Sequence, residues 1–232
     1  FKNELGSQVL FLDGAMGTMV QNLGLTDAAF GGPEFKMLTD LLVFSRPDDL
    51  EGLHLEYLRA GANLIETDTF GASPLRLKEF DFSKFDSSDL KAIPESLDLT
   101  TCSLESLTLQ LNIEGCRIAR KAVEKYRAQP DYDGRPLFVA GSIGPSNYVV
   151  SSTEANLNKG TFDQIVENFY HQVLGLIEGG ADVLLIETQQ DILETKAIIE
   201  GANKAFAEKK IKLPMIVQAT VDVFSKMQIF NT

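Results

Sequence analysis

The sequence has no tryptophan, only two cysteines and two histidines, and fewer basic residues than acidic ones. With 21 Lys and Arg against 33 Asp and Glu, the formal net charge is −12 and the pI is about 4.6. A surface of this sign repels phosphate, which argues against nucleic acid or an anionic membrane as a partner. No apolar run approaches the roughly 18 residues of a membrane-spanning helix, and the N-terminus has no recognisable signal peptide. We therefore expect a cytoplasmic protein, and because residue 1 is Phe we expect a trimmed or processed piece of a longer chain.

The scarcity of cysteine and histidine limits the chemistry. Cys102 and Cys116 form neither a CxxC pair nor a metal cluster, so we expect two unpaired structural thiols in a reducing compartment. His54 falls on the apolar face of a predicted helix and is expected in the core, and His171 has no potential metal ligand at a suitable spacing. A G-x-G-x-x-G motif and a P-loop are also missing. No catalytic and no metal-ligating residue is therefore assigned.

What the sequence does contain is an alternation of apolar runs and helical patterns. Strands are predicted at residues 9–12, 64–70, 137–142, 183–188 and 215–220, and helices at 47–60, 103–127, 161–178 and 192–207. Strands separated by helices predict a parallel sheet in an α/β fold. Five such units fit either an open doubly wound sheet or the first part of a (β/α)₈ barrel. Residues 79–101 are rich in Ser, Asp and Lys, and are expected to be an irregular excursion on the surface.

Acidic residues at predicted strand ends are the candidate functional groups. Asp13 follows the first apolar run, Glu66 and Asp68 follow the second, and Glu187 follows the fourth. A barrel would gather them at one mouth, where their repulsion would raise their pKa values unless a metal or a ligand ammonium were bound. Asp13 precedes Gly14, and an acid followed by free backbone N–H groups can hold a zwitterion. The alternative is that Asp13 only starts a turn or caps a helix.

Five stretches resemble a known family in their order and spacing: residues 12–19, 40–43, 54–70, 139–147 and 179–188. They are similar to the homocysteine S-methyltransferase domain, most closely to the N-terminal module of cobalamin-dependent methionine synthases. The resemblance implies a (β/α)₈ TIM barrel of which only about the first five βα units are present. Residues 1–232 would then be the N-terminal part of a homocysteine-binding domain, with 79–101 as an insertion. Asp68 stands where the family pattern has Asn.

The resemblance also implies a substrate site. Asp13 and Glu187 match the acids that hold the ammonium of homocysteine, and the backbone of Gly14 and Ala15 matches the loop that receives its carboxylate. The predicted substrate-binding residues are Asp13, Gly14, Ala15, Glu66, Asp68, Ser142 and Glu187.

The implied reaction of the full-length enzyme is methyl transfer from methylcobalamin to the zinc-activated homocysteine thiolate, giving methionine. Folate and cobalamin modules of the same polypeptide would be its partners. The zinc-binding cysteines of the family lie on later strands, and neither Cys102 nor Cys116 corresponds to them. We therefore expect these 232 residues alone to bind no zinc at this site and to be inactive. We also expect the unpaired edge of the fifth strand to be covered by a partner or to leave a moderately stable monomer.

Two other functions remain open at this point. One is a stand-alone homocysteine methyltransferase that uses S-methylmethionine or betaine as the methyl donor. The other is a non-catalytic α/β domain that binds an amino acid.

Overall fold

The computed structural model describes residues 1–94, 97–151 and 158–221, which are built around a four-stranded parallel sheet. Its strands are β1 (Leu64–Glu66), β2 (Phe138–Ile143), β3 (Val183–Gln189) and β4 (Met215–Ala219). They lie in chain order, and each pairs in parallel with the next. This order lacks the reversal that defines a doubly wound sheet, so it favours a barrel-like α/β arrangement.

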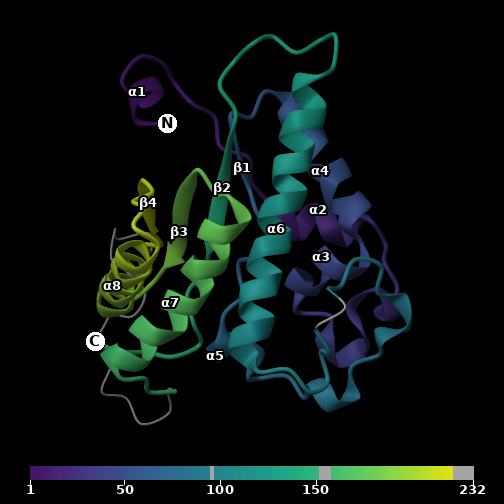
Figure 1. The fold of residues 1–232 in the computed structure, drawn as a ribbon, viewed down its shortest axis with the longest axis vertical. Helices are drawn as coiled ribbons and strands as arrows, with labels where there is room; N and C mark the ends of the chain where they lie inside the picture. The colour runs from purple at the N-terminus through teal and green to yellow at the C-terminus, as the bar shows by residue number, and fades with distance from the viewer. Residues whose placement is uncertain (95–96, 152–157, 222–232) are drawn as a thin grey trace.

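Four long helices cover one face of the sheet. Helix α4 (Pro47–Ala60) precedes β1, and α6 (Leu104–Arg127), α7 (Phe162–Gly179) and α8 (Ile192–Lys209) connect the successive strands. Figure 1 shows these helices side by side, with α6 in the middle of the molecule. The predicted alternation of strands and helices is thus confirmed for these units.

The two faces of the sheet differ because side chains alternate along a strand. Ile65 and Ile186 point to the helical side and are fully buried there. The other face carries the small apolar cluster Leu64, Ala140, Val183 and Leu185. Residues near the N-terminus, including Phe1 and Leu12, pack against this second face. Beyond this apolar cluster, toward the carboxyl ends of the strands, the same face of the sheet carries polar side chains.

Residues 9–12 do not form the buried strand that their composition predicts. Leu12 makes only an isolated parallel bridge to Leu64, while Val9 and Phe11 are 76% and 63% exposed. The described sheet therefore has four strands instead of five, and an isolated bridge takes the place of the predicted first strand. The physical reason is that this segment pairs with β1 on one side and has no second strand beside it in the described structure. The next strand is also shorter than predicted, since β1 ends at Glu66.

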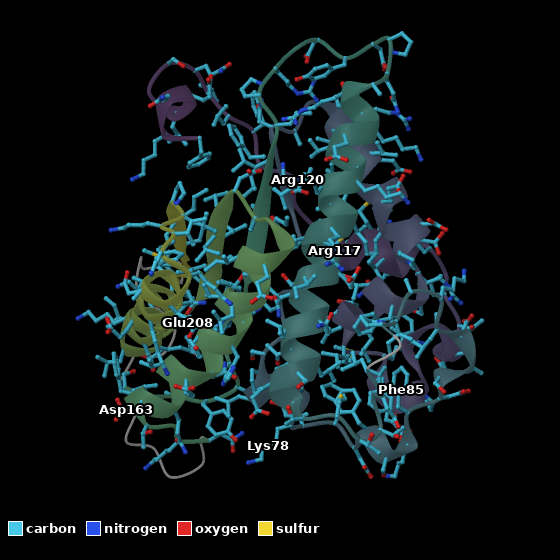
Figure 2. The ribbon with its side chains drawn as sticks, in the orientation of Figure 1. Lys78, Phe85, Arg117, Arg120, Asp163 and Glu208 are labelled. Carbon is cyan, nitrogen blue, oxygen red and sulfur yellow. The ribbon has the colours of Figure 1, made fainter. Side chains whose placement is uncertain are left out.

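The described part of the segment 79–101 is not merely a surface excursion. Its buried apolar side chains are Phe82, Phe85, Leu97 and Leu99. The rings of Phe82 and Phe85 lie 5.3 and 5.2 Å from that of Phe35, between centroids, in a second apolar core beside α6 (Figure 2 labels Phe85). Phe85 also packs against Gly31, whose φ of 86° and lack of a side chain are both needed there. The burial of these residues was not predicted, because their irregular spacing matches neither a helical nor a strand period.

The short elements lie mainly in this second core. They are α1 (Lys2–Leu5), α2 (Met16–Asn22), α3 (Leu42–Ser45), α5 (Pro74–Leu77), and the 3-10 helices η1 (Asp27–Phe30), η2 (Pro33–Phe35), η3 (Thr39–Leu41), η4 (Phe82–Lys84) and η5 (Ser87–Asp89). Within the described ranges, no helix combines the length and the apolar character needed to cross a membrane.

The helix boundaries follow local signals in the sequence. Gly61 and Gly180 end α4 and α7 in the left-handed conformation, with φ of 111° and 88°. Thr161 and Gln164 form a reciprocal capping box at the start of α7, as their spacing of three residues predicts. The apolar pattern of residues 161–178 predicts that Phe162 is buried, but in the structure it occupies the first turn of α7 and is 37% exposed.

Helices α6 and α7 approach closely at two glycines of α7. A Cβ added to Gly175 would lie 2.6 Å from the Cβ of Asn112 and 2.7 Å from the carbonyl oxygen of Leu109. A Cβ added to Gly179 would lie 2.6 Å from the Cβ of Cys116. The absence of two side chains thus lets the helical layer close over the sheet.

We expect Gly175→Ala to destabilise the fold by about 1–3 kcal/mol, because the new methyl group overpacks a helix–helix contact. Gly52→Ala is the matched control, since Gly52 lies inside α4 and no atom lies within 4 Å of the added Cβ. That control should be neutral or stabilising by about 0.5–1 kcal/mol. Urea denaturation measures both, and equal effects of the two substitutions would contradict this account of the α6–α7 contact.

Candidate functional site

The site lies at the carboxyl ends of β1, β2 and β3. Glu66 ends β1, Ser142 is the fifth residue of β2, and Glu187 is the fifth residue of β3. Strand register places all three on the face opposite the helices, in line with Leu64, Ala140 and Leu185. The hydroxyl of Ser142 donates a hydrogen bond of 2.6 Å to Oε1 of Glu187. The structure thus unites residues from three strands that the sequence separates widely.

These side chains line a cavity of about 260 Å³. Its lining residues are Ala15, Met16, Gly17, Thr39, Glu66, Thr67, Asp68, Phe70, Ser142 and Glu187. Five of the seven predicted substrate-binding residues are among them: Ala15, Glu66, Asp68, Ser142 and Glu187. No lysine, arginine or histidine belongs to this lining in the described structure.

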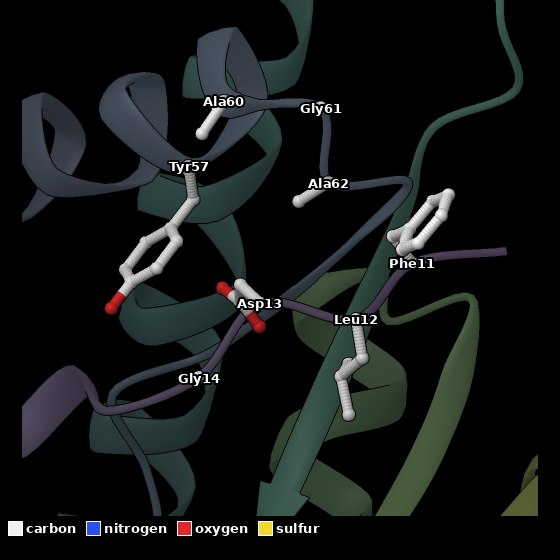
Figure 3. A pocket seen from close by; sticks show the side chains of 8 residues that line it. All are labelled: Phe11, Leu12, Asp13, Gly14, Tyr57, Ala60, Gly61 and Ala62. Atoms are coloured by element: carbon white, nitrogen blue, oxygen red, sulfur yellow. The ribbon is translucent and has the colours of Figure 1, made fainter.

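The other two predicted residues line a neighbouring cavity. Asp13 and Gly14 border a space of about 470 Å³ between the N-terminal segment and α4, together with Tyr57 (Figure 3). Both carboxylate oxygens of Asp13 accept the backbone N–H of Glu66 at 3.0 Å. Asp13 therefore lies directly behind the Glu66 backbone. Its charge interacts with those of Glu66 and Glu187, which line the 260 Å³ cavity.

Burial and mutual repulsion make the acids resist ionisation. Burial raises the pKa of Asp13 to about 7, and the charge of Glu187 adds to this effect. The hydrogen bond from the backbone N–H of Glu66 acts in the opposite direction. Burial, followed by the charges of Glu187 and Asp13, raises the pKa of Glu66 to about 8. Burial also raises the pKa of Glu187, although the Ser142 hydroxyl opposes this. A cation entering among these groups would relieve the repulsion, which is the property expected of an ammonium-binding site.

The loop after β1 is held by a chain of buried hydrogen bonds. Thr67 Oγ1 accepts the backbone N–H of Ser142 at 3.0 Å and lies 2.6 Å from Thr69 Oγ1, which donates to the Ser142 carbonyl at 2.9 Å. Gln172 on α7 donates to the Thr69 carbonyl at 2.7 Å, and Asn112 on α6 donates to the Ala72 carbonyl at 2.8 Å. The covering helices thereby fix the position of the residues between Glu66 and Ala72.

Two non-glycine residues beside the site adopt left-handed backbone conformations. Ala15 has φ 47° and Thr188 has φ 58°. Such a conformation is unfavourable, above all for a β-branched residue such as Thr188. Each follows one of the predicted ammonium-binding acids by one or two positions. No sequence signal distinguishes these residues, because both types are common in ordinary strands and helices.

The structure also shows residues that the sequence argument did not select. Thr39 lines the first cavity, Asp40 lies beside Asp68, and Tyr57 lines the second cavity. Burial, followed by the charges of Asp13 and Glu66, raises the pKa of Tyr57. Asp40 and Tyr57 both lie in family-like stretches, 40–43 and 54–70, which was the available sequence signal. Thr39 lies in none of the five stretches.

The histidines and cysteines lie elsewhere. His54 is buried, as predicted, and burial lowers its pKa to about 4. Cys102 and Cys116 are free, and burial raises the pKa of the Cys116 thiol to about 12. Across residues 1–94, 97–151 and 158–221, no three His, Cys, Asp or Glu side chains are arranged to hold a metal ion. These described residues therefore do not fit a zinc site.

The sequence profile of the homocysteine S-methyltransferase family matches residues 10–229. The chain belongs to this family. Its membership agrees with the resemblance carried by the five stretches, whose motifs supply Glu66, Asp68, Ser142 and Glu187 to the cavity.

Solved structures of the homocysteine methyltransferase MmuM from Escherichia coli share the fold. The metallated form has a TM-score of 0.67 and 24% identity, and the match covers 95% of this chain and 66% of that one. The oxidized form has a TM-score of 0.66 and 24% identity over 94% and 64% of the two chains. The apo form has a TM-score of 0.59 and 26% identity, and the match covers 94% of this chain and 62% of that one. This chain thus spans slightly less than two thirds of the length of these proteins.

The raised pKa values predict how stability depends on pH. A carboxyl group whose pKa is higher in the folded than in the unfolded chain stabilises the fold while protonated and loses this contribution as it ionises. For Asp13 and Glu66 the loss extends from their ordinary values near 4 up to about 7 and about 8. We expect the melting temperature of the ligand-free chain to fall between about pH 4 and pH 8.

Glu66→Gln should reduce this fall and stabilise the chain on the order of 2 kcal/mol at about pH 8.5. Glu56→Gln, on the exposed side of α4, is the matched control and should leave the pH dependence unchanged. Thermal melting followed by circular dichroism measures all three proteins. Parallel curves for the wild type and Glu66→Gln would contradict the proposed repulsion.

Proposed function

We propose that this chain is the homocysteine-binding part of a homocysteine methyltransferase barrel, most like the N-terminal module of a methionine synthase. The observation that carries the proposal is the convergence of Glu66, Ser142 and Glu187 on one cavity that has no basic side chain in its described wall. Family membership supplies the substrate class. In this proposal residues 1–232 form the first five or so units of a (β/α)₈ barrel, and 79–101 is an insertion.

The cavity suits a small zwitterion. Its volume of about 260 Å³ corresponds to roughly eight or nine water molecules at ~30 Å³ each, a space that accepts a small amino acid. Glu187, oriented by Ser142, would accept hydrogen bonds from the ammonium group. Glu66 at the end of β1 and Asp13 behind it would add negative potential. The backbone of Gly14 and Ala15 would receive the substrate carboxylate. These residues bind and orient the substrate, and none is assigned a chemical step.

The methyl-transfer step is proposed for the full-length enzyme. Zinc and methylcobalamin are its proposed cofactors, and folate and cobalamin modules of the same polypeptide are its proposed partners. Because the described residues do not fit a metal site, we derive no step through zinc from them. The free cysteines suit a reducing compartment, and we propose a cytoplasmic location.

A stand-alone homocysteine methyltransferase is the second candidate. The observation in its favour is the shared fold with structures that are themselves named homocysteine methyltransferase. S-methylmethionine or betaine would then replace methylcobalamin as the methyl donor. A non-catalytic amino-acid-binding domain is the third possibility, and it would show binding in a full-length protein that never turns over with any of these donors.

Binding to L-homocysteine tests the main proposal. We expect Glu187→Gln to weaken binding at least tenfold, since a charge-assisted hydrogen bond contributes about 1.5–3 kcal/mol. The amide oxygen of Gln can still accept the Ser142 hydroxyl, so the substitution removes charge with little change in shape. Isothermal titration calorimetry measures the affinity of each protein.

Asp163→Asn is the matched control, because Asp163 is exposed in the first turn of α7 (labelled in Figure 2) and lines neither of the two cavities. It should bind homocysteine as the wild type does. 4-Mercaptobutanoic acid, which lacks the ammonium group, should bind the wild type much more weakly than homocysteine. Equal affinity for the two ligands would refute the ammonium site.

We further expect the 232-residue chain to bind homocysteine without producing methionine. Methylcobalamin, S-methylmethionine and betaine, each supplied with zinc, are the donors to test by chromatography of the products. Turnover with any of them, or tight stoichiometric zinc binding by the chain, would show that residues outside our assignment complete the active site.

A further inference from the structure

Two buried carboxyl groups meet at the wall of the cavity. Asp40 and Asp68 are only 3% and 5% exposed, and they come from η3 and from the loop after β1. Asp68 Oδ1 accepts a long hydrogen bond of 3.3 Å from Thr39 Oγ1. No hydrogen-bond donor reaches Asp68 Oδ2, which is fully buried. An ionised carboxylate with an unpartnered oxygen would be costly at this position.

The surroundings of the two groups are unequal. Asp40 Oδ1 accepts the backbone N–H of Gly71 at 2.8 Å, and the positive charge of Arg76 also favours its ionised form. Asp68 receives only the Thr39 hydroxyl, and the negative charge of Asp40 opposes its ionisation. A proton held between them therefore resides on Asp68.

We propose that Asp68 is a protonated carboxyl group that donates a hydrogen bond into the cavity, to the carboxylate of the bound amino acid. This inference rests on the proposed function and assigns Asp68 the opposite end of the substrate from Glu187. A carboxylic acid kept neutral by an apolar or anionic environment is an effective donor at neutral pH.

The composition of the cavity favours such a neutral donor beside the backbone N–H groups of Gly14 and Ala15. Its described lining includes no cationic side chain, so a substrate carboxylate must be held by neutral groups. An ionised Asp68 would repel that carboxylate, whereas a protonated one attracts it. Asp68 lies two residues beyond Glu66 along the chain, and it shares the wall with Thr39 and Gly17. The ammonium group of the zwitterion would thus lie at the acids of the strand ends, and its carboxylate would lie at Asp68.

The charged groups around Asp68 set the pH at which it loses its proton. Asp40 faces it from η3, while Glu66 from β1 and Glu187 from β3 line the same cavity. Arg76 on α5 acts on Asp40 and is itself paired with Glu79. The residues of α2 in the lining, Met16 and Gly17, do not titrate. Burial, followed by the charge of Asp40, raises the pKa of Asp68 to about 8.

The test is the pH dependence of homocysteine binding to the wild type and to Asp68→Asn. The asparagine amide is a neutral donor at every pH, and it fills nearly the same volume. The titrations of the substrate and of the other acids are common to both proteins, so the ratio of their Kd values isolates Asp68. We expect the Kd of the wild type divided by that of Asp68→Asn to be constant below about pH 7. Above about pH 8 this ratio should rise roughly tenfold per pH unit, because the wild type loses affinity.

A second ligand identifies the group that Asp68 contacts. 3-Aminopropane-1-thiol is homocysteine without its carboxylate, and its Kd ratio for the two proteins should not rise with pH. Asp68→Ala, which removes the donor, should weaken homocysteine binding below about pH 7, where the wild type is protonated, and affect this analogue little. Identical pH profiles of the wild type and Asp68→Asn with homocysteine, or the same rise with both ligands, would overturn the proposal.

The protonation state can be read without any ligand. Infrared difference spectra of the wild type minus Asp68→Asn at about pH 6 should contain the C=O stretch of a protonated carboxyl group, which disappears above about pH 9. Failure to find this band overturns the inference while leaving homocysteine binding intact. Failure of the wild type to bind homocysteine at any pH overturns the proposed function instead, together with the ligand contact inferred here.

Discussion

The negative charge gathered at the carboxyl ends of the sheet is the constraint on which the site depends. Glu66 and Glu187 are held on one face by the two-residue period of their strands, and Asp13 is fixed behind them by the N–H of Glu66. None has a cationic partner in the described lining of the cavity. Such an arrangement is unfavourable in the empty protein, because each group raises the cost of ionising the next. The cost is recovered when a cation binds, so the same repulsion that weakens the fold strengthens ligand binding.

A charged cluster of this kind can persist only on a rigid support. The support comes from the helical layer, where Gly175 and Gly179 allow α6 and α7 to approach closely. From these helices Asn112 and Gln172 reach the loop after β1 and bind its backbone carbonyls. Packing on one face of the sheet thereby determines geometry on the other. The strained backbones of Ala15 and Thr188 lie where the two acidic segments leave this support.

The sequence predicted the features that depend on local periodicity and capping. The boundaries of α4 and α7 follow from Pro47, Gly61, the Thr161–Gln164 box and Gly180, each of which acts within one helical turn. Glu66 and Glu187 were selected because both end apolar runs, and strand parity then brought them to one cavity. The family assignment rested on motif order, which survives even where single elements are misjudged.

Other features depended on contacts that a single segment does not encode. Residues 9–12 read as a buried strand, yet burial requires neighbours on both sides, and in the described structure only β1 supplies one. The buried aromatic residues of 79–101 were hidden in a polar composition because their partner, Phe35, lies far away in the sequence. Asp40 was not selected as a site residue, since its importance arises only from its approach to Asp68.

Both edges of the described sheet carry exposed apolar side chains. At one end Val9 and Phe11 are exposed beside β1, and at the other Val217 is 45% exposed on β4, which pairs with β3 alone among the described residues. Apolar strand edges of this kind favour association. Asp13 lies within two residues of the first edge, and its cavity with Tyr57 opens there. Any strand or partner that covers this edge would bury Asp13 further, raise the cost of its ionisation and increase the preference of the site for a cation. Closure of the sheet and recognition of the substrate ammonium are therefore coupled through one carboxyl group.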